Sequence, residues 1–198
     1  MSKLGDPRHR HDAFFKKARG AGFAARSVYK LEEIDRRLRL MRRGDRVLDL
    51  GCRPGSWMQY ALQAVGPHGA VVGIDRDPLP KPIAGARVLH GDIFATPDAE
   101  LLGTLAAFDV VLSDMAPNTT GTRATDQARS ASLFDEALTR AERLLAPGGA
   151  FVGKIFQGPD VDALRKRMAA RFSDVRVLKP ESSRTASIEI YLAGKGFA

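Results

Sequence analysis

Seven short apolar runs, spread along most of the chain, limit what this sequence can fold into more than any other feature. They lie at residues 46–50, 70–74, 86–90, 108–113, 149–156, 174–178 and 187–193. Segments with helical character fit between them at 55–64, 97–106, 126–145 and 160–171. Strands that are almost entirely apolar and alternate with helices predict a mainly parallel sheet that is covered on both faces.

The last connection breaks this alternation. Residues 179–186, "KPESSRTA", are too few for a crossover helix, so the final two strands should pair as an antiparallel hairpin. A seven-stranded, mostly parallel α/β sheet that ends in such a hairpin is typical of the Rossmann-like class I methyltransferase fold. A plain dinucleotide-binding fold does not usually end in this way.

The positive charge is concentrated at the start of the chain. The net charge is +8, and residues 1–46 hold fourteen Lys/Arg against six Asp/Glu, whereas residues 47–198 hold seventeen of each. A basic segment beside a neutral body indicates a polyanionic partner, most simply nucleic acid. The alternative is a solvated tail that only improves solubility.

The same region suggests how the chain is divided. Residues 1–22 look loosely structured, and apolar residues recur at helical spacing from 27 to 40. We therefore predict a basic, partly flexible arm at 1–26 and a single domain at 27–198. The expected phosphate contacts are Lys16, Lys17, Arg19, Arg26, Arg36 and Arg37.

Other features of the composition bear on the compartment and on metals. No apolar run approaches the ~20 residues that span a bilayer, and the polar, basic start has no signal-peptide core. The single cysteine, Cys52, excludes an internal disulfide, and it offers no metal-site spacing with the four histidines. We expect a cytoplasmic protein with no membrane partner and no metal.

The segment "VLDLGCRPGSW" at 47–57 carries the first chemical signal. Gly51 and Gly55 allow the backbone to approach a ligand closely after the first strand, and Asp75 ends the next strand 24 positions after Gly51. An acid at that place typically binds ribose hydroxyls, although tight glycine turns also occur for packing alone. Asp92 ends the third strand, where it can reach an adenine edge or merely cap a loop.

The glycine pattern also discriminates between cofactors. A dinucleotide needs G-x-G-x-x-G to seat its pyrophosphate, and the chain reads G-C-R-P-G-S instead. The G-x-x-x-x-G-K-[ST] phosphate loop is absent as well. S-adenosyl-L-methionine, which has a ribose but no phosphate, suits these residues best.

Ionisable side chains occur in otherwise apolar strands. Asp114 follows the fourth strand, Lys154 lies within the fifth and Glu189 lies in the seventh. Such groups are costly to bury without a partner, which makes them candidates for a site. Lys154 could instead extend out of an edge strand, and Lys30, beside the apolar stripe of the first helix, could simply be solvated.

Taken together, the motifs identify a resemblance. From about Lys16 to Gly194 the sequence resembles the RrmJ/FtsJ-type ribosomal RNA 2′-O-methyltransferases, through "RSVYKLEEI", "DLGCRPGSW", "SDMAPNTTGT", "LAPGG", "KIFQG" and "KPESSR". The resemblance implies a catalytic tetrad of Lys30, Asp114, Lys154 and Glu189. It also implies S-adenosyl-L-methionine contacts at Gly55, Trp57, Asp75, Asp92 and Asp114, to which the turn adds Gly51.

The resemblance further implies a substrate and a product. The expected target is a uridine of large-subunit ribosomal RNA near the peptidyl-transferase centre, in a 50S-type particle, with S-adenosyl-L-homocysteine as product and a monomeric enzyme. The family's first motif usually reads A-P-G-G where this chain has "RPGS". Arg53 could weaken cofactor binding, point to solvent or contact RNA phosphate, and Ser56 is equally unusual.

Methyl transfer to a ribose hydroxyl requires in-line alignment and a group that acts on the hydroxyl. Lys154, with Lys30 as a neighbouring cation, is the candidate base, or it only steers the hydroxyl. Asp114 and Glu189 would orient the two ammonium groups.

Several rival chemistries fit less well. A base C5-methyltransferase needs a cysteine nucleophile, whereas Cys52 lies in the cofactor turn; "DMAPN" is not the [DN]-P-P-[FY] of amino-methyltransferases. A small-molecule or protein methyltransferase leaves the basic arm unexplained. A catalytically weak RNA-binding assembly factor on the same fold is the remaining alternative, and the complete tetrad argues against it.

Overall fold

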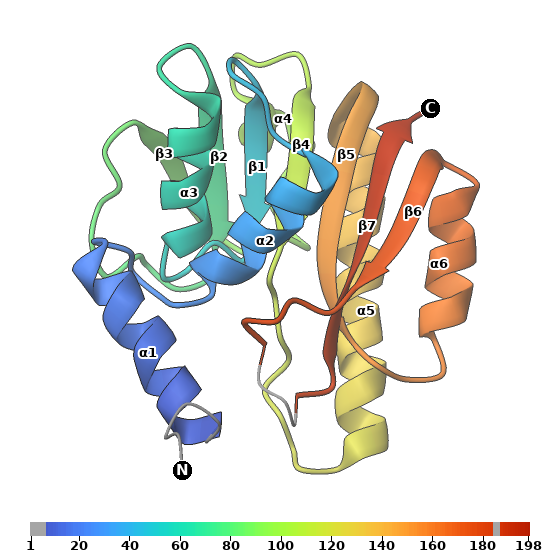
Figure 1. The fold of residues 1–198 in the computed structure, drawn as a ribbon. Coiled ribbons are helices and arrows are strands. Elements are labelled where there is room, and N and C mark those ends of the chain that lie inside the picture. Colours follow the sequence, from blue (N-terminus) through green and yellow to red (C-terminus); the bar gives the residue numbers. More distant parts are fainter. Residues whose placement is uncertain (1–6, 184–186) are drawn as a thin grey trace.

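The computed structural model describes residues 7–183 and 187–198 and contains one seven-stranded sheet (Figure 1). The strand order is β3-β2-β1-β4-β5-β7-β6. The strands are β1 (Arg46–Leu50), β2 (Ala70–Asp75), β3 (Ala86–His90), β4 (Phe108–Ser113), β5 (Leu145–Phe156), β6 (Phe172–Leu178) and β7 (Glu189–Phe197). The helices are α1 (Pro7–Gly20), α2 (Val28–Leu38), α3 (Ser56–Val65), α4 (Asp98–Leu102), α5 (Arg123–Leu144) and α6 (Val161–Ala169).

The pairing of the strands confirms the predicted fold class. β1 to β5 run parallel to one another, and β7 is antiparallel to both β5 and β6. The final two strands therefore pair as the hairpin that the short connection predicted, with β7 inserted between β5 and β6. Residues 184–186 of that connection lie outside the described residues.

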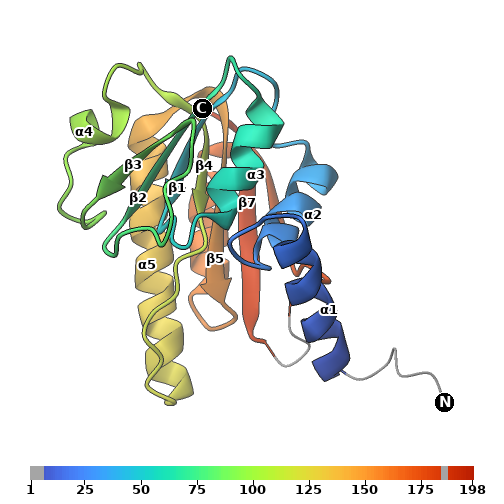
Figure 2. The same ribbon diagram turned by 90° about the vertical axis from the view of Figure 1, so that its left-hand side faces the viewer.

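Helices cover the two faces of the sheet, as Figure 2 shows with α4 and α5 on one side and α1, α2 and α3 on the other. Alternate residues of β1 separate the two cores. Leu48 and Leu50 pack with Phe134 of α5, whereas Val47 packs with Ile34 of α2 and other α2 and α3 side chains. No helix among the described residues is both long and apolar enough to cross a membrane.

The largest difference from the sequence prediction is at the amino end. Residues 1–22 were expected to be loose, but Pro7–Gly20 form helix α1, so this expectation is wrong for the described part. Contacts between helices explain the difference: Phe14 packs on Tyr29 with ring centroids 5.5 Å apart, and buried Ala18 joins Val28 and Tyr29 in a small cluster. Residues 1–6 lie outside the described residues, and the boundary at residue 26 stays a prediction.

Element boundaries differ elsewhere by a few residues. Helix α4 is shorter than predicted, and α5 begins three residues earlier, at Arg123. The strand predicted at 149–156 already begins at Leu145, directly after α5, so the "PGG" of 147–149 lies within β5. Leu145 pairs with Phe108 before a register shift in the β4–β5 ladder.

Topology brings the predicted site residues to one edge of the sheet. The carboxyl ends of β1, β2 and β4 meet at the lower edge in Figure 1. Because β7 runs the other way, its first residue, Glu189, lies opposite Phe156, the last residue of β5. The antiparallel hairpin thus places an acid from the end of the chain beside the carboxyl ends of parallel strands.

Candidate active site

The turn between β1 and α3 needs its two glycines for both conformation and space. Gly51 and Gly55 have φ angles of 74° and 107°, which non-glycine residues rarely adopt. A Cβ atom on Gly51 would overlap the Met115 side chain, and one on Gly55 would overlap Ile83. The turn therefore packs so closely against Met115 and Ile83 that neither glycine has room for a side chain.

Beside this turn lies a cavity of about 740 Å³ at the ends of β1, β2 and β4. Four of the predicted cofactor-binding residues line it, namely Gly51, Asp75, Asp92 and Asp114. The other two do not: Gly55 is buried, and Trp57 donates its indole N–H to the Ser27 carbonyl at 2.9 Å. Apolar side chains, including Phe94 and Met115, complete the wall.

The carboxylate of Asp75 is held at the tip of β2 by two backbone amides. Arg53 N donates to Oδ2 and Asp77 N donates to Oδ1, each at 2.9 Å. The acid and the glycine turn are therefore linked directly, because Arg53 belongs to that turn. A carboxylate fixed in this way can accept further hydrogen bonds from a pair of hydroxyl groups.

Asp92 is also fixed, but through an arginine. Phe94 N donates to its Oδ1 at 2.9 Å, and Arg76 donates to its Oδ2 at 2.6 Å. The Phe94 amide and then Arg76 lower the pKa of this carboxyl below its usual range, against the opposing effect of burial. A ligand amine at Asp92 must share the carboxylate with Arg76, a constraint that the sequence did not reveal.

Asp49, in β1, is a buried acid for which the sequence suggested no role. Its exposed fraction is 1%, and neither carboxylate oxygen has a hydrogen-bond partner among the described residues. Burial, followed by the negative charges of Asp114 and Asp75, raises its pKa well above the usual range. The protonated form of Asp49 is therefore favoured, and the carboxyl groups that line the cavity include those of Asp75, Asp92 and Asp114.

These features suit S-adenosyl-L-methionine. Its sulfonium and ammonium are cations, which match the carboxyl groups of Asp75 and Asp114 in the cavity wall, and its ribose hydroxyls match the acceptor at Asp75. Its adenine needs an apolar wall, which Phe94 and Met115 provide. The residues present therefore fit the cofactor that the sequence predicts.

Asp114 also belongs to the first of two ion pairs in which a buried lysine meets a partly buried carboxylate. Lys154 Nζ donates to the Asp114 carbonyl oxygen at 2.6 Å and lies 3.1 Å from its Oδ1. Lys154 is only 7% exposed, because β5 is an inner strand between β4 and β7. This placement excludes the alternative in which Lys154 extends from an edge strand.

The second ion pair joins Lys30 of α2 to Glu189 of β7, with 2.8 Å between Nζ and Oε2. Lys30 is 8% exposed, so it is not the solvated side chain of the alternative reading. Burial acts to raise the pKa of Glu189, but the charges of Lys30 and Lys154 outweigh it and lower the pKa. The four residues 30, 114, 154 and 189 are thus brought together from distant parts of the chain.

Tyr191 is a further member of the site that the sequence analysis missed. Its hydroxyl donates to Asp114 Oδ1 at 2.6 Å, and its ring lies 5.9 Å from Trp57 and 5.8 Å from Lys30 Nζ. Burial and then Asp114 raise the pKa of the phenol, which keeps the donor protonated. The sequence did offer a signal for Tyr191: it lies two residues after Glu189 on the same strand, and such residues share a face of the sheet.

The atypical serine of the turn has a structural partner. The hydroxyl of Ser56, at the start of α3, lies 3.0 Å from the hydroxyl of Ser27, just before α2. Ser56 is 2% exposed, so the two hydroxyls can satisfy each other away from solvent. Ser56, which departs from the family pattern, therefore links the start of α3, next to the glycine turn, to the start of α2, which carries Lys30.

The predicted RNA-binding residues are mostly exposed on the amino-terminal helices. Lys16, Lys17 and Arg19 lie on α1, and Arg36 lies on α2. Three of the six make contacts within the described part of the protein. Lys17 Nζ lies 4.6 Å from the centroid of the Tyr29 ring. Arg37 pairs with Glu33 at 2.7 Å and lies 3.8 Å from Glu181, and Arg26, which is partly buried between the helices, also has a partner.

The sequence and the fold both match known proteins. The model of the FtsJ-like methyltransferase family matches residues 23–197. The chain is 50% identical over 190 residues to ribosomal RNA large subunit methyltransferase E of Sorangium cellulosum, covering 96% of this chain and 89% of that one. It is 48% identical to the Desulfatibacillum aliphaticivorans protein of the same name, with 92% and 89% covered.

A solved structure agrees with these matches. A Plasmodium falciparum protein described as a ribosomal RNA methyltransferase superposes with a TM-score of 0.77 at 28% identity, covering 88% of this chain and 98% of that one. The family match spans the glycine turn, both ion pairs and the terminal hairpin. The chain therefore belongs to the FtsJ-like methyltransferase family.

Proposed function

We propose that this enzyme transfers the methyl group of S-adenosyl-L-methionine to a ribose 2′-hydroxyl of large-subunit ribosomal RNA. The observation that carries the proposal is the double role of Asp114. Asp114 lines the cofactor cavity and also holds the amine of buried Lys154. A cofactor in the cavity and a hydroxyl at Lys154 would therefore meet at one residue.

The names of the relatives support the RNA substrate, since they are large-subunit ribosomal RNA methyltransferases. The motif resemblance supports a uridine near the peptidyl-transferase centre, methylated in a 50S-type particle. It also supports a monomer, and the single cysteine, Cys52, favours the reducing cytoplasm. The exposed cations on α1 and α2 provide a surface for the RNA backbone.

When bound, the cofactor supplies an electrophilic methyl group. The chain's own residues have to place the hydroxyl oxygen in line with it and receive the proton that leaves. Lys154 Nζ, whose contacts in the described part are both to Asp114, is held for this task. We assign Lys154 the role of accepting the hydroxyl proton, with Lys30, held by Glu189 at 2.8 Å, as the neighbouring cation.

The structure also bears on the rival with a cysteine nucleophile. Cys52 is 3% exposed, and burial followed by the charges of Asp49 and Asp75 raises the pKa of its thiol. A thiolate is therefore disfavoured at this position. A non-catalytic RNA-binding protein would not need two buried lysines paired with carboxylates beside a cofactor-sized cavity, because burying such charges is seldom stabilising in itself.

The test is transfer of a radiolabelled methyl group to undermodified ribosomal RNA. Lys154→Ala should reduce the single-turnover rate by about 100-fold or more, the scale of general acid–base catalysis, and leave cofactor affinity within a few-fold. Lys166→Ala, an exposed lysine on α6, is the matched control and should transfer normally. A Lys154→Ala variant that retains more than about a tenth of the rate contradicts the role of Lys154.

A further inference from the structure

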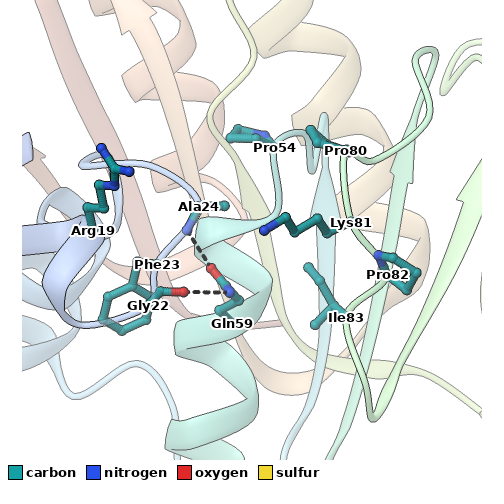
Figure 3. A pocket seen from close by; sticks show the side chains of 10 residues that line it. All are labelled: Arg19, Gly22, Phe23, Ala24, Pro54, Gln59, Pro80, Lys81, Pro82 and Ile83. Carbon is teal, nitrogen blue, oxygen red and sulfur yellow. Dashed lines mark hydrogen bonds between the residues drawn. The ribbon is translucent and has the colours of Figure 1, made fainter.

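A second cavity, of about 430 Å³, lies beside the cofactor cavity (Figure 3). Its walls come from the α1–α2 linker, the first turn of α3 and the loop between β2 and β3. Pro54 and Pro80 line both cavities, so the two share a wall. Its size falls within the ~300–1,000 Å³ of ordinary ligand sites.

The linker side of this cavity is fixed by Gln59 of α3. Ala24 N donates to the Gln59 side-chain oxygen at 2.8 Å, and the Gln59 side-chain amide donates to the Gly22 carbonyl at 3.2 Å. Phe23, between these two contacts, packs against the cluster formed by Ala18, Val28 and Tyr29. The wall is therefore held at two backbone positions around a partly buried aromatic ring.

The charged residues that line the cavity are both cations. Arg19 and Lys81 are exposed, and neither forms an ion pair with a carboxylate in the described part of the chain. In Figure 3 the Lys81 side chain extends over the cavity toward the linker. Arg53, the atypical residue of the turn, is an exposed cation next to Pro54 and likewise has no carboxylate partner among the described residues.

The remaining walls are apolar, with Phe23, Pro54, Pro82 and Ile83 facing the cavity. Unpaired cations at the mouth and apolar walls inside are complementary to a nucleotide. Its phosphate is bound by the cations, and its base packs on the apolar and aromatic surface. Ribosomal RNA supplies such nucleotides where its bases are unstacked.

We propose that this cavity binds one unstacked nucleotide of the RNA substrate, on the strand that carries the target nucleotide. The inference rests on the proposed function, because it takes RNA to be the substrate. In this proposal Lys81 and Arg19 bind the phosphate of the nucleotide. Arg53, which belongs to the cofactor turn, is a further cation beside the same nucleotide. The departure from the family's A-P-G-G motif is then a contribution to RNA binding.

The test is binding of a fluorescent single-stranded oligoribonucleotide, followed by anisotropy over a range of salt concentrations. Lys81→Ala should lower the slope of log affinity against log salt by about 0.7, the value for one lost phosphate contact on a single strand. Ala24→Trp fills the cavity without changing any charge, and should weaken binding at least about fivefold at every salt concentration. Lys166→Ala, on α6, removes the same charge elsewhere and should bind as the wild type does.

Thermal unfolding of each variant controls for misfolding. Lys81 is an exposed loop residue, where truncation should leave the fold intact. Wild-type binding by both Lys81→Ala and Ala24→Trp would overturn the proposal. The proposal would also be overturned if these variants bound the oligoribonucleotide normally but no longer methylated ribosomal particles. The cavity would then bind a ribosomal protein rather than RNA. Methyl transfer by the wild type to undermodified ribosomal particles is measured separately, so a failed cavity and a failed function give different results.

Discussion

Tyr191→Phe removes a single hydroxyl from the site and keeps the aromatic ring. That hydroxyl donates to Asp114 Oδ1 at 2.6 Å, and the residue is 0% exposed, so water cannot replace the lost donor. A hydrogen bond to a charged group contributes about 1.5–3 kcal/mol to the free energy of unfolding. For a chain of this size each kcal/mol corresponds to about 2–4 °C, so the melting temperature should fall by roughly 3–12 °C.

The same change should slow the reaction. Tyr191 and Lys154 both contact Oδ1 of Asp114, so without the Tyr191 hydroxyl this oxygen keeps only the lysine, and the carboxylate and the paired amine become less well fixed. We expect the methyl-transfer rate per folded molecule to fall about tenfold to a hundredfold, as for other small misplacements of reacting groups. Single-turnover transfer to ribosomal RNA measures this effect.

Tyr60→Phe provides the matched control. Tyr60 also donates to a carboxylate, Asp35 Oδ2 at 2.8 Å, but joins α3 to α2 away from the ion pairs. It should lose some stability and no methyl-transfer activity. A Tyr191→Phe variant that matches the wild type in both melting temperature and rate would refute the claim that Tyr191 positions Asp114.

Three further changes test other parts of the site. Asp75→Ala should weaken S-adenosyl-L-methionine binding at least about tenfold in calorimetry, because hydrogen bonds to a carboxylate are lost; unchanged affinity would contradict the assignment. The folded protein binds the Asp49 proton more tightly than the unfolded chain does, so stability falls as the pH rises above the usual aspartate value of about 3.9. Asp49→Asn should therefore raise the melting temperature of the cofactor-free protein near pH 7, and this gain should shrink as the pH approaches 4. An equal or lower melting temperature at pH 7 would contradict the raised pKa of Asp49. Neutralising Lys16, Lys17 and Arg19 together should reduce the salt slope of RNA binding by about 2, whereas a merely solubilising tail predicts no change.

Most of the sheet was predictable because its strands are apolar runs bounded by turn residues. The four ionisable residues 30, 114, 154 and 189 were conspicuous for the same reason, since each interrupts or borders an apolar pattern. Their pairing depended on topology, which placed Glu189 opposite the end of β5.

What the sequence did not predict depends on contacts between distant segments. Helix α1 is basic and glycine-flanked, and its packing through Phe14 on Tyr29 becomes visible only once α2 is in place. The hydrogen bond between the side chains of Ser27 and Ser56, the Arg76 contact to Asp92 and the tyrosine at Asp114 also join different elements. No local sequence pattern predicts these hydrogen bonds, because the two partners are brought together only by the tertiary structure.

The position of the transferred methyl group tests the central claim most directly. Ribosomal RNA labelled by the enzyme with radioactive S-adenosyl-L-methionine is hydrolysed completely in alkali, a reaction that needs a free 2′-hydroxyl at each cleaved link. If the methyl group is on the ribose 2′-oxygen, the label should appear in an alkali-resistant dinucleotide, and Lys154→Ala should form that product at least about 100-fold more slowly. Label recovered in single nucleotides would place the methyl group on a base and would contradict the account.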